Sequence, residues 1–181
     1  MKSLKDRQRR GILKTLLGTS FASLLHPAAR AIETSERRLS FHHMHTGEQL
    51  DVTYARDGRH IDSALTEVNE FLSDFRTGDI TTIDPDLLDL LYDIRESLGS
   101  DGRYEVISAY RSPETNEMLR SRGSGVARNS QHLLGTAIDV RLEGVDLASL
   151  RDTAIAMQRG GVGYYEASNF VHVDTGRVRR W

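Results

Sequence analysis

The chain has 181 residues, of which 38% are hydrophobic and 28% charged, proportions typical of a globular domain with its own core. It contains no cysteine, which excludes disulfides and thiolate ligands, so any metal must be held by His, Asp or Glu. Residues 32–181 hold 17 Arg, no Lys and 25 acidic residues, and this negative balance argues against a nucleic-acid-binding protein.

The first 31 residues have the layout of an export signal. A basic segment precedes a moderately apolar stretch, residues 12–25, and small residues follow up to Ala31. The order Arg9-Arg10-Gly11-Ile12-Leu13-Lys14 resembles a twin-arginine signal. We expect residues 1–31 to be removed, residues 32–181 to form the mature domain, and the protein to be periplasmic without stable membrane insertion. The alternative is an amphipathic helix or a disordered basic tail.

The first elements of the mature chain are a hairpin and two helices. Leu39–His45 and Gln49–Tyr54 flank Thr46-Gly47-Glu48, a pattern typical of a β-hairpin. The apolar spacing from Ile61 to Phe75 predicts a helix. Asp84-Pro85 predicts the start of a second helix, with Asp as the N-cap, that ends near Gly99.

The second half of the chain mixes short strands with helices. A strand is expected over 104–109, a helix from Ser112-Pro113 to about Arg122, a strand over 136–141 and a helix from Asp146 to Met157. Two closing strands are expected over 162–165 and 169–173. The pattern predicts a single α+β domain with a small central, mainly antiparallel sheet flanked by about four helices.

Two histidines lie in runs that suggest a metal site: His132, followed by Asp139, and His172. A catalytic zinc takes three protein ligands and leaves one position for water, and two imidazoles with one carboxylate meet that need. His172 and Asp174 are two residues apart on a predicted strand, so they face the same side. The spacing alone is a weak pattern, because a histidine beside apolar residues is more often structural.

The arrangement Ser130-x-His132-x-x-Gly135-x-Ala137-x-Asp139, followed downstream by His172, resembles the signature of the D-alanyl-D-alanine metallopeptidases. That superfamily also contains the hedgehog and lysostaphin-type domains, so the expected fold is hedgehog/D-Ala-D-Ala peptidase-like. Further runs resemble, in the same order, the YcbK-like branch, which includes murein endopeptidases. These runs are Leu39 to Tyr54, Ser108 to Asn116, Gly160 to Tyr165, Phe170 to Gly176, and Arg180-Trp181.

The resemblance implies that His132, Asp139 and His172 bind one Zn²⁺ per chain. It also implies that Arg111 faces the substrate, where its guanidinium could polarise the scissile carbonyl and stabilise the oxyanion. A surface salt bridge is the alternative for Arg111. Ser130 either binds the substrate or caps a turn.

The sequence departs from the family pattern at the general base. Many relatives carry a Glu-x-x-His motif, whereas position 169, three residues before His172, is Asn. We expect Asp174 to replace that base, with Glu166 as the second candidate. Asp174 could instead accept a hydrogen bond that orients a ligand imidazole.

These expectations lead to an exported zinc metallopeptidase that hydrolyses peptide bonds in peptidoglycan, with the cell-wall stem peptides as its substrate. A murein cross-link endopeptidase is the first hypothesis, and a D,D- or L,D-carboxypeptidase or a dipeptidase on stem peptides is close behind. A non-catalytic zinc domain that binds peptidoglycan or proteins is the rival class, because hedgehog domains show that this fold can keep its metal without proteolysis.

Overall fold

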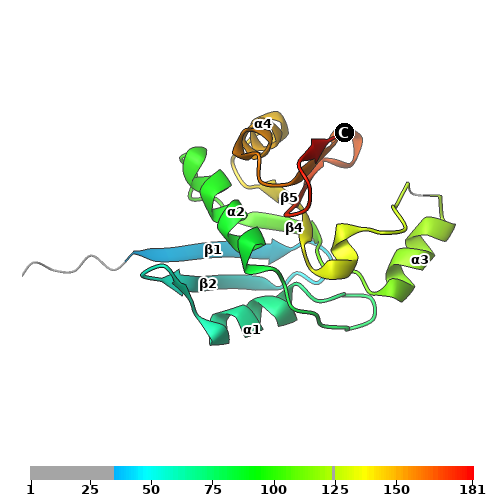
Figure 1. Cartoon of the computed structure of the whole chain (residues 1–181), viewed down its shortest axis with the longest axis horizontal. Helices are drawn as coiled ribbons and strands as arrows, with labels where there is room; N and C mark the ends of the chain where they lie inside the picture. The colour runs from blue at the N-terminus through cyan, green and yellow to red at the C-terminus, as the bar shows by residue number, and fades with distance from the viewer. Residues whose placement is uncertain (1–34, 124) are drawn as a thin grey trace, which may run out of the picture. The chain divides into compact units, whose positions relative to one another are not determined.

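A mixed eight-stranded sheet with four α-helices makes up the part of the chain that the computed structural model describes, residues 35–123 and 125–181 (Figure 1). The expected export signal, residues 1–31, lies outside these ranges. The strands are β1 (Glu36–His43), β2 (Gln49–Arg56), β3 (Arg59–His60), β4 (Tyr104–Ser108), β5 (Ala137–Leu142), β6 (Gly161–Tyr165), β7 (Phe170–Asp174) and β8 (Arg179–Arg180). The helices are α1 (Asp62–Phe71), α2 (Pro85–Ser97), α3 (Pro113–Ser121) and α4 (Leu147–Met157), with 3₁₀ turns η1 (Gln131–Leu134) and η2 (Glu166–Ser168).

The strand order in the sheet is β3-β2-β1-β4-β5-β7-β6-β8. β1 runs parallel to β4 and β6 runs parallel to β8, while the other neighbouring strands are antiparallel. The predicted α+β class and the mainly antiparallel sheet are therefore confirmed. The sheet is wider than the small one expected, because β3 and β8, each two residues long, extend its two edges.

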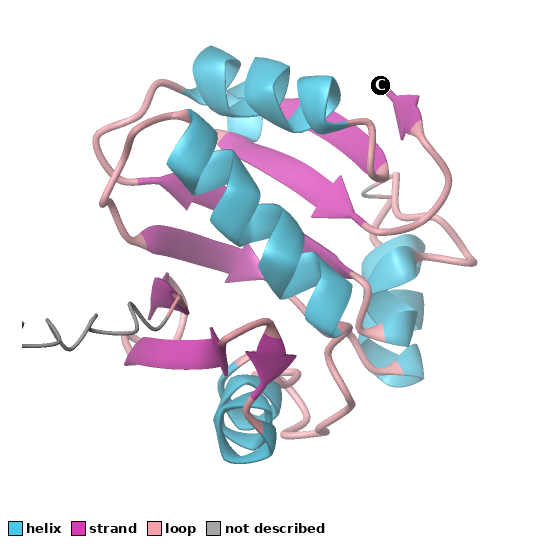
Figure 2. Cartoon of the chain, turned by 60° about the vertical axis from the view of Figure 1, so that its left-hand side comes forward, coloured by secondary structure: helices cyan, strands magenta, loops and turns pink. Residues whose placement is uncertain are grey.

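Helices α2 and α4 lie side by side across one face of the sheet (Figure 2). The cap signals in the sequence mark the starts of these helices: Asp84 accepts the backbone N–H of Asp86, and Asp146 accepts that of Ser149. Ser112 caps α3 in the same way through the N–H of Thr115. The predicted starts of three helices are thus confirmed by the local hydrogen bonds on which they were based.

The helix predicted over residues 61–75 is wrong at its C-terminal end, because α1 ends at Phe71. The apolar spacing continues to Phe75, but the chain turns away after Leu72. The buried Asp74 forms this turn: its carboxylate accepts the backbone N–H groups of Arg76 and Ser112, and its own N–H donates to Asp79. A side chain that binds backbone groups competes with helix continuation in this way.

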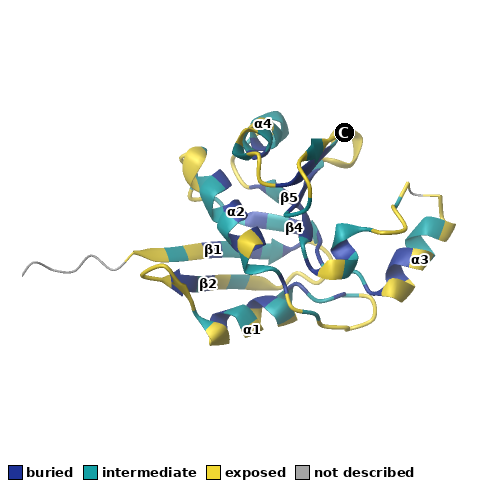
Figure 3. Cartoon of the chain, in the orientation of Figure 1, coloured by how far each residue is buried: buried dark blue, intermediate teal, exposed yellow. Residues whose placement is uncertain are grey.

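Buried apolar residues of the sheet and of helices α1, α2 and α4 form one core. Figure 3 marks the buried residues along these elements in dark blue. β5 is the most deeply buried strand, with five of its six residues buried. Three of the buried polar residues, Asp139, His172 and Asp174, lie where β5 meets β7. Across the described residues, no helix combines the length and the apolarity that a bilayer span requires.

Candidate metal centre

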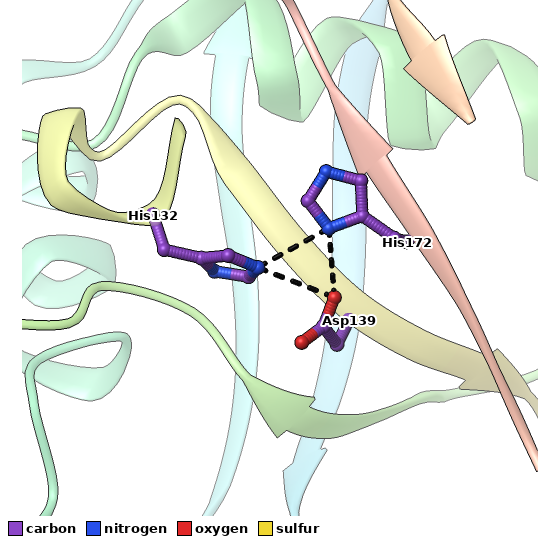
Figure 4. Close-up of side chains that lie close together, drawn as sticks. All are labelled: His132, Asp139 and His172. Atoms are coloured by element: carbon purple, nitrogen blue, oxygen red, sulfur yellow. Dashed lines mark hydrogen bonds and ion pairs between the residues drawn. The ribbon is translucent and has the colours of Figure 1, made fainter. Parts of the chain in front are cut away.

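Strand pairing brings two of the three candidate ligands together. β5 and β7 are antiparallel neighbours, and Asp139 is the direct cross-strand partner of His172. Directly opposed residues of an antiparallel pair project on the same face of the sheet. As a result, His172 Nδ1 lies 2.8 Å from Asp139 Oδ1 (Figure 4).

The third side chain, His132, comes from the short turn η1 that precedes β5. Ser130 caps this turn by accepting the backbone N–H of His132 through its hydroxyl oxygen. Gly135 ends the turn at a φ of 69°, and a Cβ there would lie 2.4 Å from the Thr82 carbonyl oxygen. Only glycine fits this left-handed position against the neighbouring backbone. The packing thereby fixes the direction in which His132 enters the site.

Three donor atoms converge: His132 Nε2, Asp139 Oδ1 and His172 Nδ1 (Figure 4). His132 Nε2 lies 3.2 Å from His172 Nδ1 and 3.3 Å from Asp139 Oδ1. Two ligands each about 2.0–2.1 Å from a tetrahedral ion are separated by roughly 3.3–3.4 Å, close to these values. All three residues are buried, and they are the only group in the described part of the chain that combines three such donors at this spacing.

The ring nitrogen of each histidine that points away from the three converging atoms has its own hydrogen-bond partner. His132 Nδ1 lies 2.6 Å from the carbonyl oxygen of Ala109, to which it donates. His172 Nε2 lies 2.9 Å from Asp174 Oδ2. Outer hydrogen bonds of this kind set the tautomer, so that the inner nitrogen of each ring presents its lone pair to a metal. The residues present therefore fit a metal ion held by two imidazoles and a carboxylate.

The protonation of these groups follows from burial and from their mutual contacts. Burial lowers the pKa of His132. Burial alone would also lower the pKa of His172, but its hydrogen bonds to Asp139 and Asp174 outweigh this and raise it. Burial would raise the pKa of Asp139, yet the two imidazoles hold it well below its usual range. Asp139 is thus ionised, as a metal ligand must be.

Asp174 is fully enclosed and its carboxylate has five donors around it. Oδ2 accepts from His172 and from Arg179, at 2.6 Å, while Oδ1 accepts the N–H groups of Gly161 and Gly176 and a second N–H from Arg179. Burial would raise the pKa of the Asp174 carboxyl, but these hydrogen bonds outweigh it and hold that pKa well below its usual range. Asp174 contacts the ring nitrogen of His172 that points away from the other candidate ligands.

Arg111 also reaches the site. Its guanidinium forms an ion pair with Asp139 Oδ2 and donates through Nε to the hydroxyl of Ser108 at 2.9 Å. Its side chain is 12% exposed, so the pair lies at the floor of an opening and is not a surface salt bridge. Glu166, at the start of η2, is exposed and does not line that opening.

A cavity of about 320 Å³ opens over the three candidate ligands. One part of its lining is polar and includes Asn129, Ser130 and Gln131. Another part is aromatic and comes from the end of β6, the start of β7 and the residue after β8: Tyr165, Phe170 and Trp181. Asp139 is the sole Asp or Glu among the described residues that line it.

The sequence reasoning assigned no role to Arg179, Tyr165 or Trp181, although all three line the cavity. A signal was present in the glycines of β6. A Cβ at Gly161 would lie 2.4 Å from an Arg179 nitrogen, and one at Gly163 would lie 2.6 Å from the Trp181 ring. Two glycines spaced by two in a strand indicate a close approach by another segment.

Comparison with known proteins adds an independent observation. The family described as peptidoglycan L,D-endopeptidase MepK matches residues 31–181 of this chain. The protein of that name from Escherichia coli (strain K12) is 42% identical over 180 residues, which are 97% of this chain and 98% of the relative. The probable peptidoglycan L,D-endopeptidase MepK of Haemophilus influenzae is 41% identical over 146 residues, 80% of this chain and 78% of the relative.

Proposed function

The chain belongs to the peptidoglycan L,D-endopeptidase MepK family, and on that premise we propose that it is a zinc-dependent endopeptidase that hydrolyses L,D cross-links between peptidoglycan stem peptides. The observation that carries the proposal is the convergence of His132, Asp139 and His172 under one open cavity. This arrangement leaves a side of the metal site accessible, as hydrolysis requires and as a purely structural metal site does not.

Zinc is the metal that this donor set favours. Two imidazole nitrogens, one carboxylate oxygen and no thiolate match the donors of catalytic zinc in known hydrolases. A zinc ion held in this way supplies a Lewis acid for the scissile carbonyl and lowers the pKa of bound water. The chain's own residues then have to hold the ligands in place, bind the substrate and support the developing charge.

For Asp174 we propose an orienting role in place of the general-base role expected from the sequence. Its carboxylate is enclosed and engaged by five donors, and it faces the outer nitrogen of His172. By accepting from Nε2, it keeps the hydrogen on that nitrogen and the lone pair on Nδ1. Glu166 lies outside the cavity lining, so we propose no proton transfer for it either.

For Arg111 we propose two linked tasks. Its contact with Asp139 Oδ2 leaves Oδ1 turned toward His132 and His172, which orients the candidate ligand. Because Arg111 also lines the cavity, its positive charge would be available to stabilise the oxyanion of a bound substrate. Ser130 caps η1 and also lines the cavity. We therefore propose that it contacts the substrate in addition to capping the turn.

One observation favours the non-catalytic alternative, a zinc domain that binds wall peptides. Within the described part of the chain, neither carboxylate expected to act as the base reaches the cavity. The two functions differ in a direct test, in which purified dimeric muropeptides with L,D or D,D cross-links are incubated with the protein and analysed by mass spectrometry. Endopeptidase activity converts L,D-linked dimers to monomers, stops with a chelator and returns with zinc.

Two controls sharpen that experiment. His132→Ala removes one candidate ligand, and we expect it to bind less zinc and to leave dimers intact. Monomeric muropeptides shortened at their C-terminus would identify a carboxypeptidase instead. Intact dimers with zinc-loaded wild-type protein, together with retention of the protein on wall material, would establish the binding domain.

We further propose that the protein is exported and acts in the periplasm, where peptidoglycan lies. The support is the basic, apolar and small-residue order of residues 1–31, including Arg9-Arg10. That segment lies outside the described residues, so its support comes from the sequence alone.

A further inference from the structure

Trp181 lies directly beside a candidate metal ligand. The centroid of its indole is 5.2 Å from that of the His172 ring. The backbone of Trp181 is fixed to β6: its N–H donates to Val162, and its carbonyl oxygen accepts the N–H of Tyr164. A residue 9 positions after His172 in the chain is thereby placed at the edge of the site.

The indole is also held by its side-chain contacts. Its Nε1 donates to the Tyr165 hydroxyl at 2.8 Å, and the Arg179 guanidinium lies 5.0 Å from the ring centroid. Arg179 in turn binds Asp174, which accepts from His172. Imidazole, carboxylate, guanidinium and indole therefore form a closed ring of contacts. An aromatic group fixed on several sides loses little conformational freedom when a ligand binds to it.

Gly163 makes room for this arrangement. It is the direct cross-strand partner of His172 on β7, and a Cβ at this position would lie 2.6 Å from the Trp181 ring. That distance is too short for any real contact, so a side chain there would displace the indole from His172. β6 is thus shaped to receive the indole next to the metal site.

A large part of this aromatic surface remains open. Trp181 is 51% exposed and Tyr165 is 39% exposed, and both line the cavity. Single exposed apolar residues are common and carry no meaning by themselves. Here two aromatic rings are adjacent, joined by a hydrogen bond, and braced by Phe170, which stacks on Tyr165 with centroids 4.6 Å apart. Rigid aromatic surface next to a reaction centre is suited to binding apolar parts of a ligand.

We propose that Trp181 and Tyr165 form a substrate-binding wall that contacts the saturated hydrocarbon side chain of the stem-peptide residue next to the scissile bond. The inference rests on the proposed function and names a specificity determinant of the same site. The wall contacts the peptide, because the indole lies beside His172, where the scissile peptide bond must be held. Its nearest cation, Arg179, is engaged by Asp174, so the wall binds through apolar contact and not through charge.

The test uses the fact that Trp181 is the only tryptophan in the chain. Tryptophan fluorescence therefore reports on this wall alone. Zinc-loaded wild-type protein is titrated with sugar-free monomeric stem peptides, which contain no cross-link to hydrolyse. In parallel it is titrated with the disaccharide of peptidoglycan. We expect the stem peptides to shift the emission to shorter wavelength and to reduce quenching by acrylamide. A response to the disaccharide alone, or no response to either, would overturn the proposal.

Kinetics on cross-linked muropeptides provide the second readout. Trp181→Ala is expected to raise KM about 10-fold or more, the scale of a lost apolar contact, while zinc content stays at the wild-type level. Trp181→Phe keeps an aromatic surface and is expected to show a smaller rise. Ile80→Ala is the matched control, because Ile80 is an exposed apolar residue outside the cavity lining and should leave KM unchanged.

The contrary outcomes are distinct. Loss of zinc in both Trp181 variants would show that the indole only supports His172, and an unchanged KM in Trp181→Ala would show that the wall makes no productive contact. Either result overturns the inference. Failure of the wild-type protein to cleave any cross-link would instead remove the proposed function, and the fluorescence titration would still decide whether the wall binds stem peptides.

Discussion

Replacing Asp174 by asparagine tests whether this residue orients a metal ligand or moves protons. Asparagine has the same shape but carries one oxygen and one NH₂ group, so one of the two oxygen positions becomes a donor. At the Oδ1 position the NH₂ would face three donors, and at the Oδ2 position it would face two, from His172 and Arg179. Placing the NH₂ at the Oδ2 position is therefore the less unfavourable arrangement, because it faces fewer donors there.

In that arrangement His172 can avoid a donor–donor contact only by moving its hydrogen from Nε2 to Nδ1. Nδ1 is the nitrogen that faces Asp139 and His132, and a protonated nitrogen cannot bind a metal. We therefore expect Asp174→Asn to weaken zinc binding by about 10- to 100-fold, the usual effect of removing such an outer partner. This corresponds to about 1.4–2.7 kcal/mol of binding free energy.

The same substitution also removes a buried partner from Arg179. Breaking a buried ion pair on one side costs about 3–5 kcal/mol. The Arg179 side chain is 28% exposed, so water replaces part of the lost interaction, and we expect a fall of about 3 kcal/mol in the unfolding free energy of the zinc-free protein.

Zinc affinity is measured by competition with a chromophoric chelator, and stability by urea unfolding of the zinc-free protein followed by circular dichroism. Asp152→Asn is the control, because Asp152 also pairs with an arginine, Arg151, but its side chain is 65% exposed and it does not line the cavity. Asp152→Asn should change neither quantity. A variant Asp174→Asn that binds zinc and unfolds like the wild type, yet loses activity about 100-fold, would refute the orienting role and restore the general base.

Three further predictions concern other parts of the chain. In Arg111→Lys, the single ammonium group cannot reproduce the contacts that the planar guanidinium makes with both Asp139 and Ser108. We expect kcat to fall about 10²-fold with zinc retained, and a wild-type kcat in a muropeptide assay would contradict this. Burial would raise the pKa of Asp74, but hydrogen bonds from Thr115, Ser112 and Arg76 outweigh burial and lower that pKa. The ionised Asp74 carboxylate therefore stabilises the fold fully above its unfolded-state pKa of about 4, and this stabilisation is lost as the pH falls through the lower pKa of the folded state. Asp74→Asn should therefore destabilise the protein by about 1–3 kcal/mol at pH 7 in urea unfolding, with a difference from wild type that shrinks in acid; a constant difference would argue against it. Replacing Arg9 and Arg10 by Lys should trap precursor in the cytoplasm, as seen by fractionation and immunoblotting, whereas normal processing would exclude the twin-arginine route.

Local features of the sequence determined the hairpin, the helix starts and most of the strands. Asp84-Pro85, Ser112-Pro113 and Asp146 predict helix starts because a cap involves only residues within one turn of each other. The hairpin around Gly47 is likewise predictable, because its turn also involves only residues that are close in the sequence. The resemblance to a known family then selected His132, Asp139 and His172 from among the polar residues.

The end of α1 could not be read in this way. Apolar spacing is a local property, whereas α1 ends where Asp74 binds the backbone of Ser112, 38 residues later in the chain. The two strands at the edges of the sheet were missed because each is two residues long, and such a strand has no periodicity to detect.

Within the site, the tertiary structure alone decided which atoms meet. Strand register makes Asp139 and His172 cross-strand partners, and the turn before β5 brings His132 to them. The predicted strand face did place His172 and Asp174 on one side, but only the ring of contacts through Arg179 shows that Asp174 faces the outer nitrogen of His172. Trp181 reaches the cavity because β8 runs parallel to β6, a pairing between distant segments that no local pattern encodes. Sequence motifs thus selected the residue types, while long-range pairing set their directions and, with them, their chemistry.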